Sequence, residues 1–286
     1  MLQPASLAKS QSAPGRLSDL NDQGDVGGSR IRSAERTEPV IWTADHTEIV
    51  LETDAFGGVI NALAANGYAA GATYQSAGGE KVHPDGTVQP HTVPQLWQHG
   101  ERIALESPKG YGASSSDELV AVNDQGFAAG VNTVTEKNVE RPVAWTPQGV
   151  ATLLETPADS HCHAWSISDD HIVVGSAYQQ MISGDSTSTV PMPIRWTNWD
   201  SATTSTLELL PMPDSQPRPD DFPGLHLALT FVGVTEGGSV LAEYSSHLGQ
   251  SAYFYDGGKP TQINQGFDVN IYAMNRHGVV VGAIQF

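Results

Sequence analysis

A nine-residue pattern occurs six times along the chain and constrains its fold more than any other feature. Each copy combines an apolar residue, a polar turn of the Asn-x-x-Gly type and a short apolar run that usually ends in glycine. The copies begin 40 to 67 residues apart and are LNDQGDVGG (20–28), LAANGYAAG (63–71), VNDQGFAAG (122–130), ISDDHIVVG (167–175), VTEGGSVLA (234–242) and MNRHGVVVG (274–282). Repeats at this spacing are typical of folds in which each unit buries its apolar face against its neighbours.

A second pattern, which ends in tryptophan, lies between these copies. It covers Pro39–Trp42, Pro94–Trp97, Pro142–Trp145 and Pro193–Trp196, and it becomes Ala252–Tyr255 in the fifth unit. A short turn and another apolar segment follow each one. These runs predict four short strands per unit, and no helical periodicity persists over a comparable length. Four strands per unit, repeated around a ring, predict an all-β chain folded as a β-propeller of four-stranded blades.

Together the two patterns resemble the HAF-type repeats of bacterial proteins, which are similar to propeller blades. The resemblance extends from about Leu17 to Phe286 and implies a fold, but it implies almost nothing about function. This sequence departs from the pattern twice. His171 replaces the turn glycine of the fourth unit, and Tyr255 replaces the tryptophan of the fifth unit.

The repeats indicate a single domain over residues 17–286. Six copies of the glycine pattern and five of the tryptophan pattern predict 22 strands. We interpret these as six blades, with five blades and a displaced half-repeat as the alternative. Residues 1–16 form a separate N-terminal segment that is expected to close the last blade, because joining the chain ends within one blade removes exposed strand edges.

The charge balance excludes some partners. The chain has 14 Lys and Arg residues against 32 Asp and Glu residues, a formal net charge of −18. This argues against nucleic acid, because affinity for phosphates depends on clustered basic residues. No apolar run is long enough to span a membrane, so no membrane partner is expected. The first residues do not resemble a secretion signal and Cys162 is the single cysteine, so we expect a cytoplasmic protein, with export of a processed chain as the alternative.

The connections between the predicted strands place a candidate site at one end of the propeller. Because the strands pair antiparallel, the turns after the first and third strands of every unit lie at one end of the propeller. The turns after the first strands are all short. All the variation in loop length falls at the opposite end, and variable loops on a rigid scaffold are where binding and catalysis concentrate. The first strands should line a central channel there. Their entrances, with Trp165 and the long loop before the fifth unit, contribute Arg16, Glu118, His161, His163, Trp165, Asp220, Asp221, His226, Asp268 and Asn270.

Two functions remain open on these residues. The leading hypothesis is a scaffold that binds a small molecule, a glycan or a protein, since no complete catalytic motif appears. Arg16, Trp165, Asn270 and the loop residues Asp220, Asp221 and His226 would contact the ligand. The alternative is a lyase-, isomerase- or cyclase-like enzyme, in which His163 and His161 work as acid and base beside Glu118 or Asp268.

Metal binding and assembly are lesser alternatives. His161 and His163 are two residues apart, so on a strand their side chains point to the same face and could bind a divalent metal. Apart from this alternative, no cofactor is expected. The repeated tryptophans are expected to pack between neighbouring blades rather than to bind sugars. A third function, a purely structural module, predicts an exposed apolar patch near Trp199.

Overall fold

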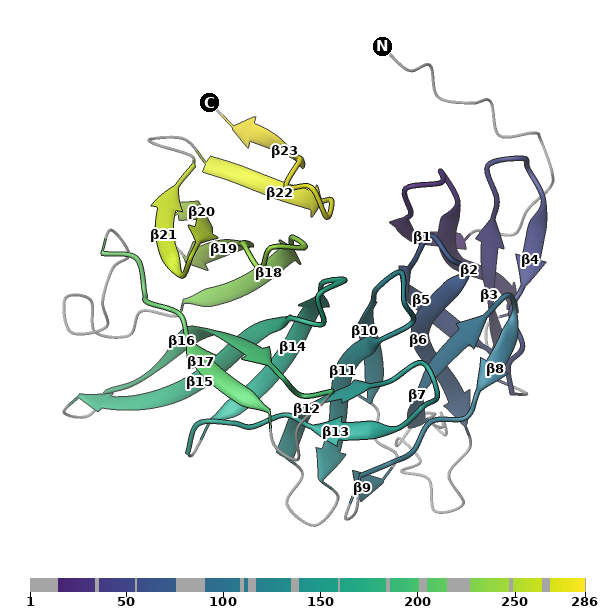
Figure 1. Cartoon of the computed structure of the whole chain (residues 1–286), viewed down its shortest axis with the longest axis horizontal. Coiled ribbons are helices and arrows are strands. Elements are labelled where there is room, and N and C mark those ends of the chain that lie inside the picture. Colours follow the sequence, from purple (N-terminus) through teal and green to yellow (C-terminus); the bar gives the residue numbers. More distant parts are fainter. Residues whose placement is uncertain are drawn as a thin grey trace.

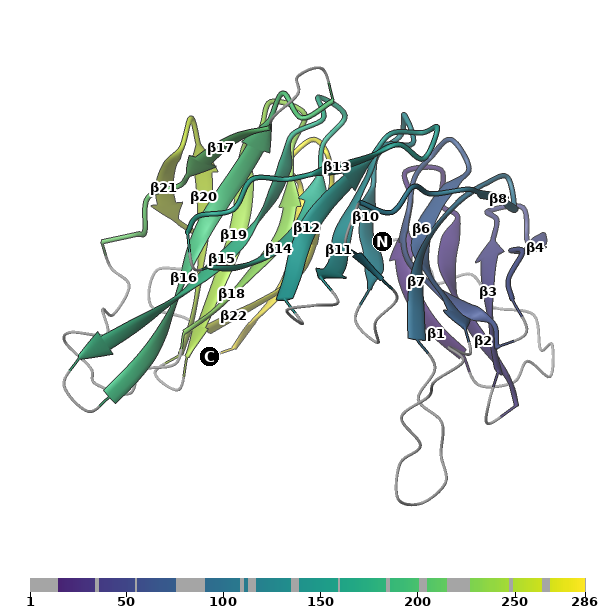
Figure 2. The same ribbon diagram turned by 90° about the horizontal axis from the view of Figure 1, so that it is seen from below.

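The computed structural model contains only strands and turns (Figures 1 and 2). It describes residues 15–33, 36–54, 56–75, 91–108, 111–112, 117–134, 139–158, 160–183, 186–200, 205–214, 227–246, 249–263 and 268–285. In this part of the chain, 23 strands form six antiparallel sheets that follow one another in sequence. The all-β prediction is confirmed.

Five of the six sheets contain the predicted four strands in the order of the sequence. The first sheet comprises β1 (Gly15–Leu20), β2 (Val26–Ser33), β3 (Arg36–Trp42) and β4 (Glu48–Val50); the second comprises β5 (Gly58–Leu63), β6 (Tyr68–Gln75), β7 (His91–Gln98) and β8 (Glu101–Ile103). The third comprises β10 (Glu118–Val122), β11 (Ala128–Val134), β12 (Val139–Trp145) and β13 (Ala151–Leu153), with the two-residue β9 (Tyr111–Gly112) paired to β11. The fourth comprises β14 (His161–Ile167), β15 (Val173–Ser183), β16 (Ser186–Thr197) and β17 (Thr206–Leu209); the fifth comprises β18 (Ala228–Val234), β19 (Val240–Ser246), β20 (Gly249–Asp256) and β21 (Lys259–Gln262). The sixth sheet contains β22 (Asp268–Met274) and β23 (Val280–Gln285).

The sheets are arranged like the blades of a propeller. The first strands β1, β5, β10, β14, β18 and β22 are neighbours in that order, and the later strands of each sheet extend outwards (Figure 1). Each glycine pattern forms the hairpin of the two inner strands, as predicted. Gly15 and Arg16 already belong to β1, whereas residues 1–14, which we expected to close the last blade, lie outside the described residues.

Side-chain hydrogen bonds hold the inner hairpin turns. Asn21 Oδ1 accepts hydrogen bonds from the backbone N–H groups of Gln23 and Asp25, and Asn123 and Asn275 repeat this pattern in the third and sixth sheets. An asparagine suits this position because its short amide mimics a backbone turn. His171, at the turn-glycine position of the fourth unit, adopts a left-handed φ of 60°, and its imidazole is bonded to Asp200 and Gln125.

Three of the four repeated tryptophans pack between adjacent sheets, which confirms the prediction for them, whereas Trp42 is partly exposed and bonds within its own sheet. Trp97, Trp145 and Trp196 are at most 1% exposed. Each indole N–H donates to a backbone carbonyl of the preceding sheet's exit segment: Trp97 to Glu52 at 2.7 Å, Trp145 to Glu106 at 3.0 Å and Trp196 to Glu155 at 2.6 Å. The core is therefore a series of apolar layers, one at each contact between neighbouring sheets from the first to the fifth.

Two further predictions concern the outer connections. The insertion between the second and third strands of the fourth unit is not a loop, because β15 and β16 pair along its whole length up to Ser183 and Ser186 (Figure 2). Trp199 is only 1% exposed and donates its indole N–H to the carbonyl of His171 at 2.6 Å, so its ring does not contribute to an exposed apolar patch. Within the described ranges, no helix is long and apolar enough to cross a membrane.

Candidate functional site

The inner strands place several predicted site residues at the same end of the molecule. Arg16, Glu118, His163 and Asn270 occupy equivalent positions in β1, β10, β14 and β22, and all four side chains are partly or fully exposed. The residues that follow Glu118 and His163, Leu119 and Ala164, are buried, as the two-residue period of a strand requires. The expected alignment of these positions is therefore present.

His163 lies in a cluster of aromatic side chains rather than beside Glu118. Its ring stacks on Trp165 with centroids 5.8 Å apart and meets the ring of Tyr178 edge-on at 6.1 Å. Its Nε2 lies 3.2 Å from Oε2 of Glu140, which β12 of the third sheet supplies. The Trp165 indole donates to Ser176 Oγ at 2.9 Å and its ring packs towards the layer between the fourth and fifth sheets, so Trp165 is held within the protein.

Burial determines the charge state of His163. Desolvation lowers the pKa of His163 from the ordinary 6.5, His161 lowers it further, and Glu140 opposes both effects. We expect the pKa of His163 to be lower still in the Glu140→Gln variant, because the carboxylate that attracts the imidazolium is lost. Titration of the imidazole signals by NMR measures this shift. Glu118→Gln is the control and should leave the titration unchanged, whereas an unchanged pKa of His163 in Glu140→Gln would contradict the pairing.

The same shift predicts how stability depends on pH. The folded pKa of His163 is lower than the unfolded value, so the unfolded chain binds the proton more readily. The contribution of His163 to stability is therefore fully present above about pH 6.5, and it is lost as the pH falls below that value and through the lower pKa of the folded state.

Glu118 belongs to a separate group of polar residues between the first three sheets. Asn61 Nδ2 donates to Glu118 Oε2 at 2.9 Å and to the Leu119 carbonyl at 2.8 Å. Tyr74 lies close to both Glu118 and Arg16; burial raises the pKa of its hydroxyl first, Glu118 raises it further and Arg16 lowers it. Among the described contacts, none joins this group to His163. The predicted ring is thus divided into two clusters.

The structure gives less information on the other predicted site residues. Asp220, Asp221 and His226 lie outside the described residues, and of Asp268 only the backbone, at the start of β22, is described. In the described part of the chain, no three histidine, cysteine or acidic side chains come together as metal ligands, so His161 and His163 have no third ligand there. Cys162 is buried in the layer between the third and fourth sheets, where desolvation raises the pKa of its thiol to about 12.

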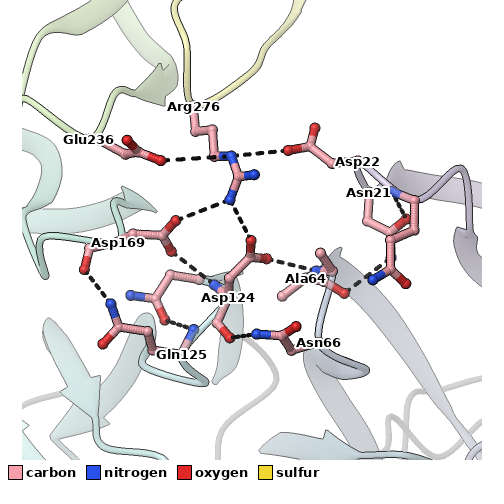
Figure 3. A network of polar contacts seen from close by, with 12 residues as sticks. Asn21, Asp22, Ala64, Asn66, Asp124, Gln125, Asp169, Glu236 and Arg276 are labelled. Carbon is pink, nitrogen blue, oxygen red and sulfur yellow. Dashed lines mark hydrogen bonds and ion pairs between the residues drawn. The ribbon is translucent and has the colours of Figure 1, made fainter.

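A polar network that sequence analysis did not reveal connects the inner turns at the other end of the molecule (Figure 3). Arg276, in the turn between β22 and β23, lies at the centre of four carboxylates from four different sheets. Its Nη1 lies 2.7 Å from Asp124 and 3.6 Å from Asp169, and its Nε lies 3.1 Å from Asp22 and 3.7 Å from Glu236. Through Asp22 this network links the last sheet to the first. Its members are turn residues that come close together only once the sheets are arranged in space.

A pocket of about 450 Å³ lies between the second and third sheets, and sequence analysis did not predict it. One part of its wall is apolar and includes Pro94, Ile103, Leu105 and Trp145. The remaining lining is polar and comprises Gln95, Arg102 and Asn132, with the exposed residues Glu52, Glu106 and Ser107. Glu52 and the 104–107 segment come from connections between sheets, which is where variable loops were predicted to carry function.

The polar groups of this pocket differ in whether they already have partners. The Arg102 guanidinium donates from Nη1 to Asp54 at 2.8 Å and from Nε to Gln95 Oε1 at 2.9 Å. Gln95 Nε2 donates to the carbonyls of Leu96 and Ile103. Asn132 is 4% exposed, and its Oδ1 is buried without a hydrogen-bond partner. Most buried polar atoms are hydrogen-bonded. Of the few exceptions among the described residues, this acceptor belongs to a residue that lines the pocket.

Comparisons with known proteins add no assignment to this geometry. No family model matches the chain, and no curated protein matches it in sequence. The function is therefore inferred from the site alone.

Proposed function

We propose that this protein is a propeller-like scaffold that binds a small molecule in the pocket between its second and third sheets. The volume of the pocket, about 450 Å³, falls within the range of typical small-molecule sites. Such sites are mainly apolar and contain a few well-placed polar groups that orient the ligand. Trp145, Leu105 and Ile103 supply the apolar wall, and Asn132 supplies the orienting group.

The unpaired Oδ1 of Asn132 is the observation that carries this proposal. A buried acceptor without a partner costs about 1–3 kcal/mol of stability, so a protein gains nothing from it unless something else satisfies it. The equivalent position, four residues after the partner of the repeated tryptophan, is the buried Ala177 in the fourth sheet and the buried Thr73 in the second sheet. The strand therefore does not need an amide at this place. Thr73 Oγ1 is also buried without a hydrogen-bond partner, but Asn132 differs from Thr73 in lining the pocket. A ligand in the pocket would be its hydrogen-bond partner.

The Ser107→Trp variant tests whether the pocket binds ligands. Ser107 is exposed at the pocket and lies outside the strands, so a large side chain can occlude the opening without disturbing a sheet. We use benzylamine, benzyl alcohol and benzoate as probes and follow backbone amide signals by NMR. At least one probe should shift the signals of Leu105 and Asn132 in the parent chain and in Ser107→Ala, but not in Ser107→Trp. Failure of all three probes to shift these signals would refute the proposal.

An enzyme that acts by acid–base catalysis is the second candidate, and the contact between His163 and Glu140 favours it. A half-buried imidazole beside a carboxylate is a common arrangement for a proton-transferring group. Glu140 takes the role that we predicted for Glu118 or Asp268, and a lyase, isomerase or cyclase reaction remains the proposed class. The NMR titration of the Glu140→Gln variant tests the pairing on which this candidate depends.

Three finer predictions are part of the same proposal. These are a closed six-bladed propeller, the resemblance to bacterial HAF-type repeats and a cytoplasmic location. The sequential sheets and the contact between Arg276 and Asp22 support the first of them. A glycan or protein partner at the long-loop end remains the alternative to a small molecule.

A further inference from the structure

We infer that the pocket selects ligands that offer a hydrogen-bond donor, as a neutral or cationic group on an apolar body, and that it rejects anions. This inference rests on the proposed function and concerns the chemical class of the ligand. It follows from comparing the pocket's donors with its acceptors. Recognition requires groups that have no partner inside the protein, because only these gain a new hydrogen bond when the ligand enters.

The positively charged donor of the pocket is already used. Arg102 is the cation among its lining residues, and Asp54 accepts from both of its terminal nitrogens, at 2.8 and 3.4 Å. The hydrogen bond from Arg102 is the main reason that the pKa of Asp54 is lowered, so the pair is held in its charged form. The Nε of Arg102 is bonded to Gln95, and the Gln95 amide nitrogen is bonded to two carbonyls. An incoming anion would therefore meet no unpaired cation among the described lining residues.

The acceptors and the local charge favour the opposite kind of ligand. Asn132 Oδ1 is buried and unpaired, so it requires a donor. Glu52 and Glu106 are exposed lining residues and carry negative charge, whereas the positive charge of Arg102 is neutralised by Asp54. The whole chain has a net charge of −18, which further disfavours anions. Ammonium, amide N–H and hydroxyl groups fit this environment, and the wall around Trp145 and Leu105 suits an apolar body.

The three benzyl probes distinguish these ligand classes because they share one ring and differ in the polar group. At neutral pH benzylamine is a cationic donor, benzyl alcohol is a neutral donor and benzoate is an anion with acceptors only. We expect NMR titrations at low salt to give the tightest binding for benzylamine, weaker binding for benzyl alcohol and no saturable binding for benzoate. Equal binding of all three probes, or a preference for benzoate, would overturn the inference and leave the pocket itself established. Absence of binding by every probe would instead refute the proposed function.

Two matched variants separate recognition from folding. Asn132→Ala should weaken benzylamine and benzyl alcohol binding about tenfold, the value of one buried hydrogen bond. Its thermal midpoint should not fall by more than about 2 °C, because the lost acceptor has no partner in the folded chain. The control is Tyr244→Phe at the equivalent position of the fifth sheet, where the hydroxyl is paired with Tyr255 at 3.0 Å. That variant should lose stability and bind the probes normally. Unchanged probe affinity in Asn132→Ala would exclude Asn132 as the recognition group.

Discussion

The Trp97→Ala variant is expected to unfold about 3–5 kcal/mol more easily than the parent chain, a larger loss than we expect for any other substitution. Trp97 is fully buried and packs with Ile41, Leu51 and Ile60 of the first two sheets. Removing its ring leaves a cavity in the layer that joins these sheets. It also leaves the Glu52 carbonyl without its indole partner. Urea unfolding followed by tryptophan fluorescence and circular dichroism measures the loss.

Two further variants separate the contributions of Trp97. Trp97→Phe keeps most of the apolar contact and removes the indole donor, so it should cost about 1–3 kcal/mol. Trp42 is the matched control, because it occupies the equivalent position of the first sheet but donates to Glu48 of its own sheet. Trp42→Ala should cost clearly less than Trp97→Ala. Equal losses for the two alanine variants would show that packing between sheets is not the source of the effect.

The Arg276→Met variant is expected to lose about 1–2 kcal/mol of stability. Arg276 is 38% exposed, so each of its ion pairs is partly screened and contributes little alone. Its removal leaves Asp22, Asp124, Asp169 and Glu236 facing one another without a cation, in a chain that is already strongly acidic. The repulsion between these carboxylates should therefore dominate. Thermal unfolding measures the loss.

Salt dependence identifies the cause of this loss. High concentrations of sodium chloride should restore much of the stability of Arg276→Met, because salt screens repulsion between exposed carboxylates. Arg276→Lys should fall between the parent and Arg276→Met, since lysine keeps the charge but not the planar fork. Arg32→Met is the control, as Arg32 is 51% exposed and, within the described part of the chain, pairs with one carboxylate, that of Glu38. A loss in Arg276→Met that does not respond to salt would contradict the electrostatic explanation.

The repeats were sufficient to predict the strands, the inner hairpins and the role of the tryptophans. These features depend on local chemistry: an asparagine turn, a two-residue period and one large ring per unit. The partners of Arg276 could not be predicted, since Asp124 lies 152 residues away and meets it only after the sheets are arranged around a common centre. His163 was placed correctly near the entrance of its strand, but its partner Glu140 belongs to another sheet whose packing was unknown.

The pocket was also beyond sequence analysis. Asn132 follows an apolar run in a strand, and nothing in that pattern distinguishes it from a paired polar residue. Its Oδ1 has no hydrogen-bond partner, while the other polar lining residues Arg102 and Gln95 are bonded to Asp54 and to two carbonyls. These pairings can be seen only from the positions of individual atoms.

The hydrogen bonds from Trp97, Trp145 and Trp196 give the array of sheets a direction. Each one joins a sheet to the sheet before it in the sequence, so the second, third and fourth sheets each depend on a predecessor. Trp42 has no such predecessor and uses Glu48 of its own sheet. In this respect the chain resembles a linear repeat protein, in which each unit is stabilised mainly by its contacts with the neighbouring units. Sequential synthesis from the N-terminus would then present every new tryptophan strand with a carbonyl that is already in place.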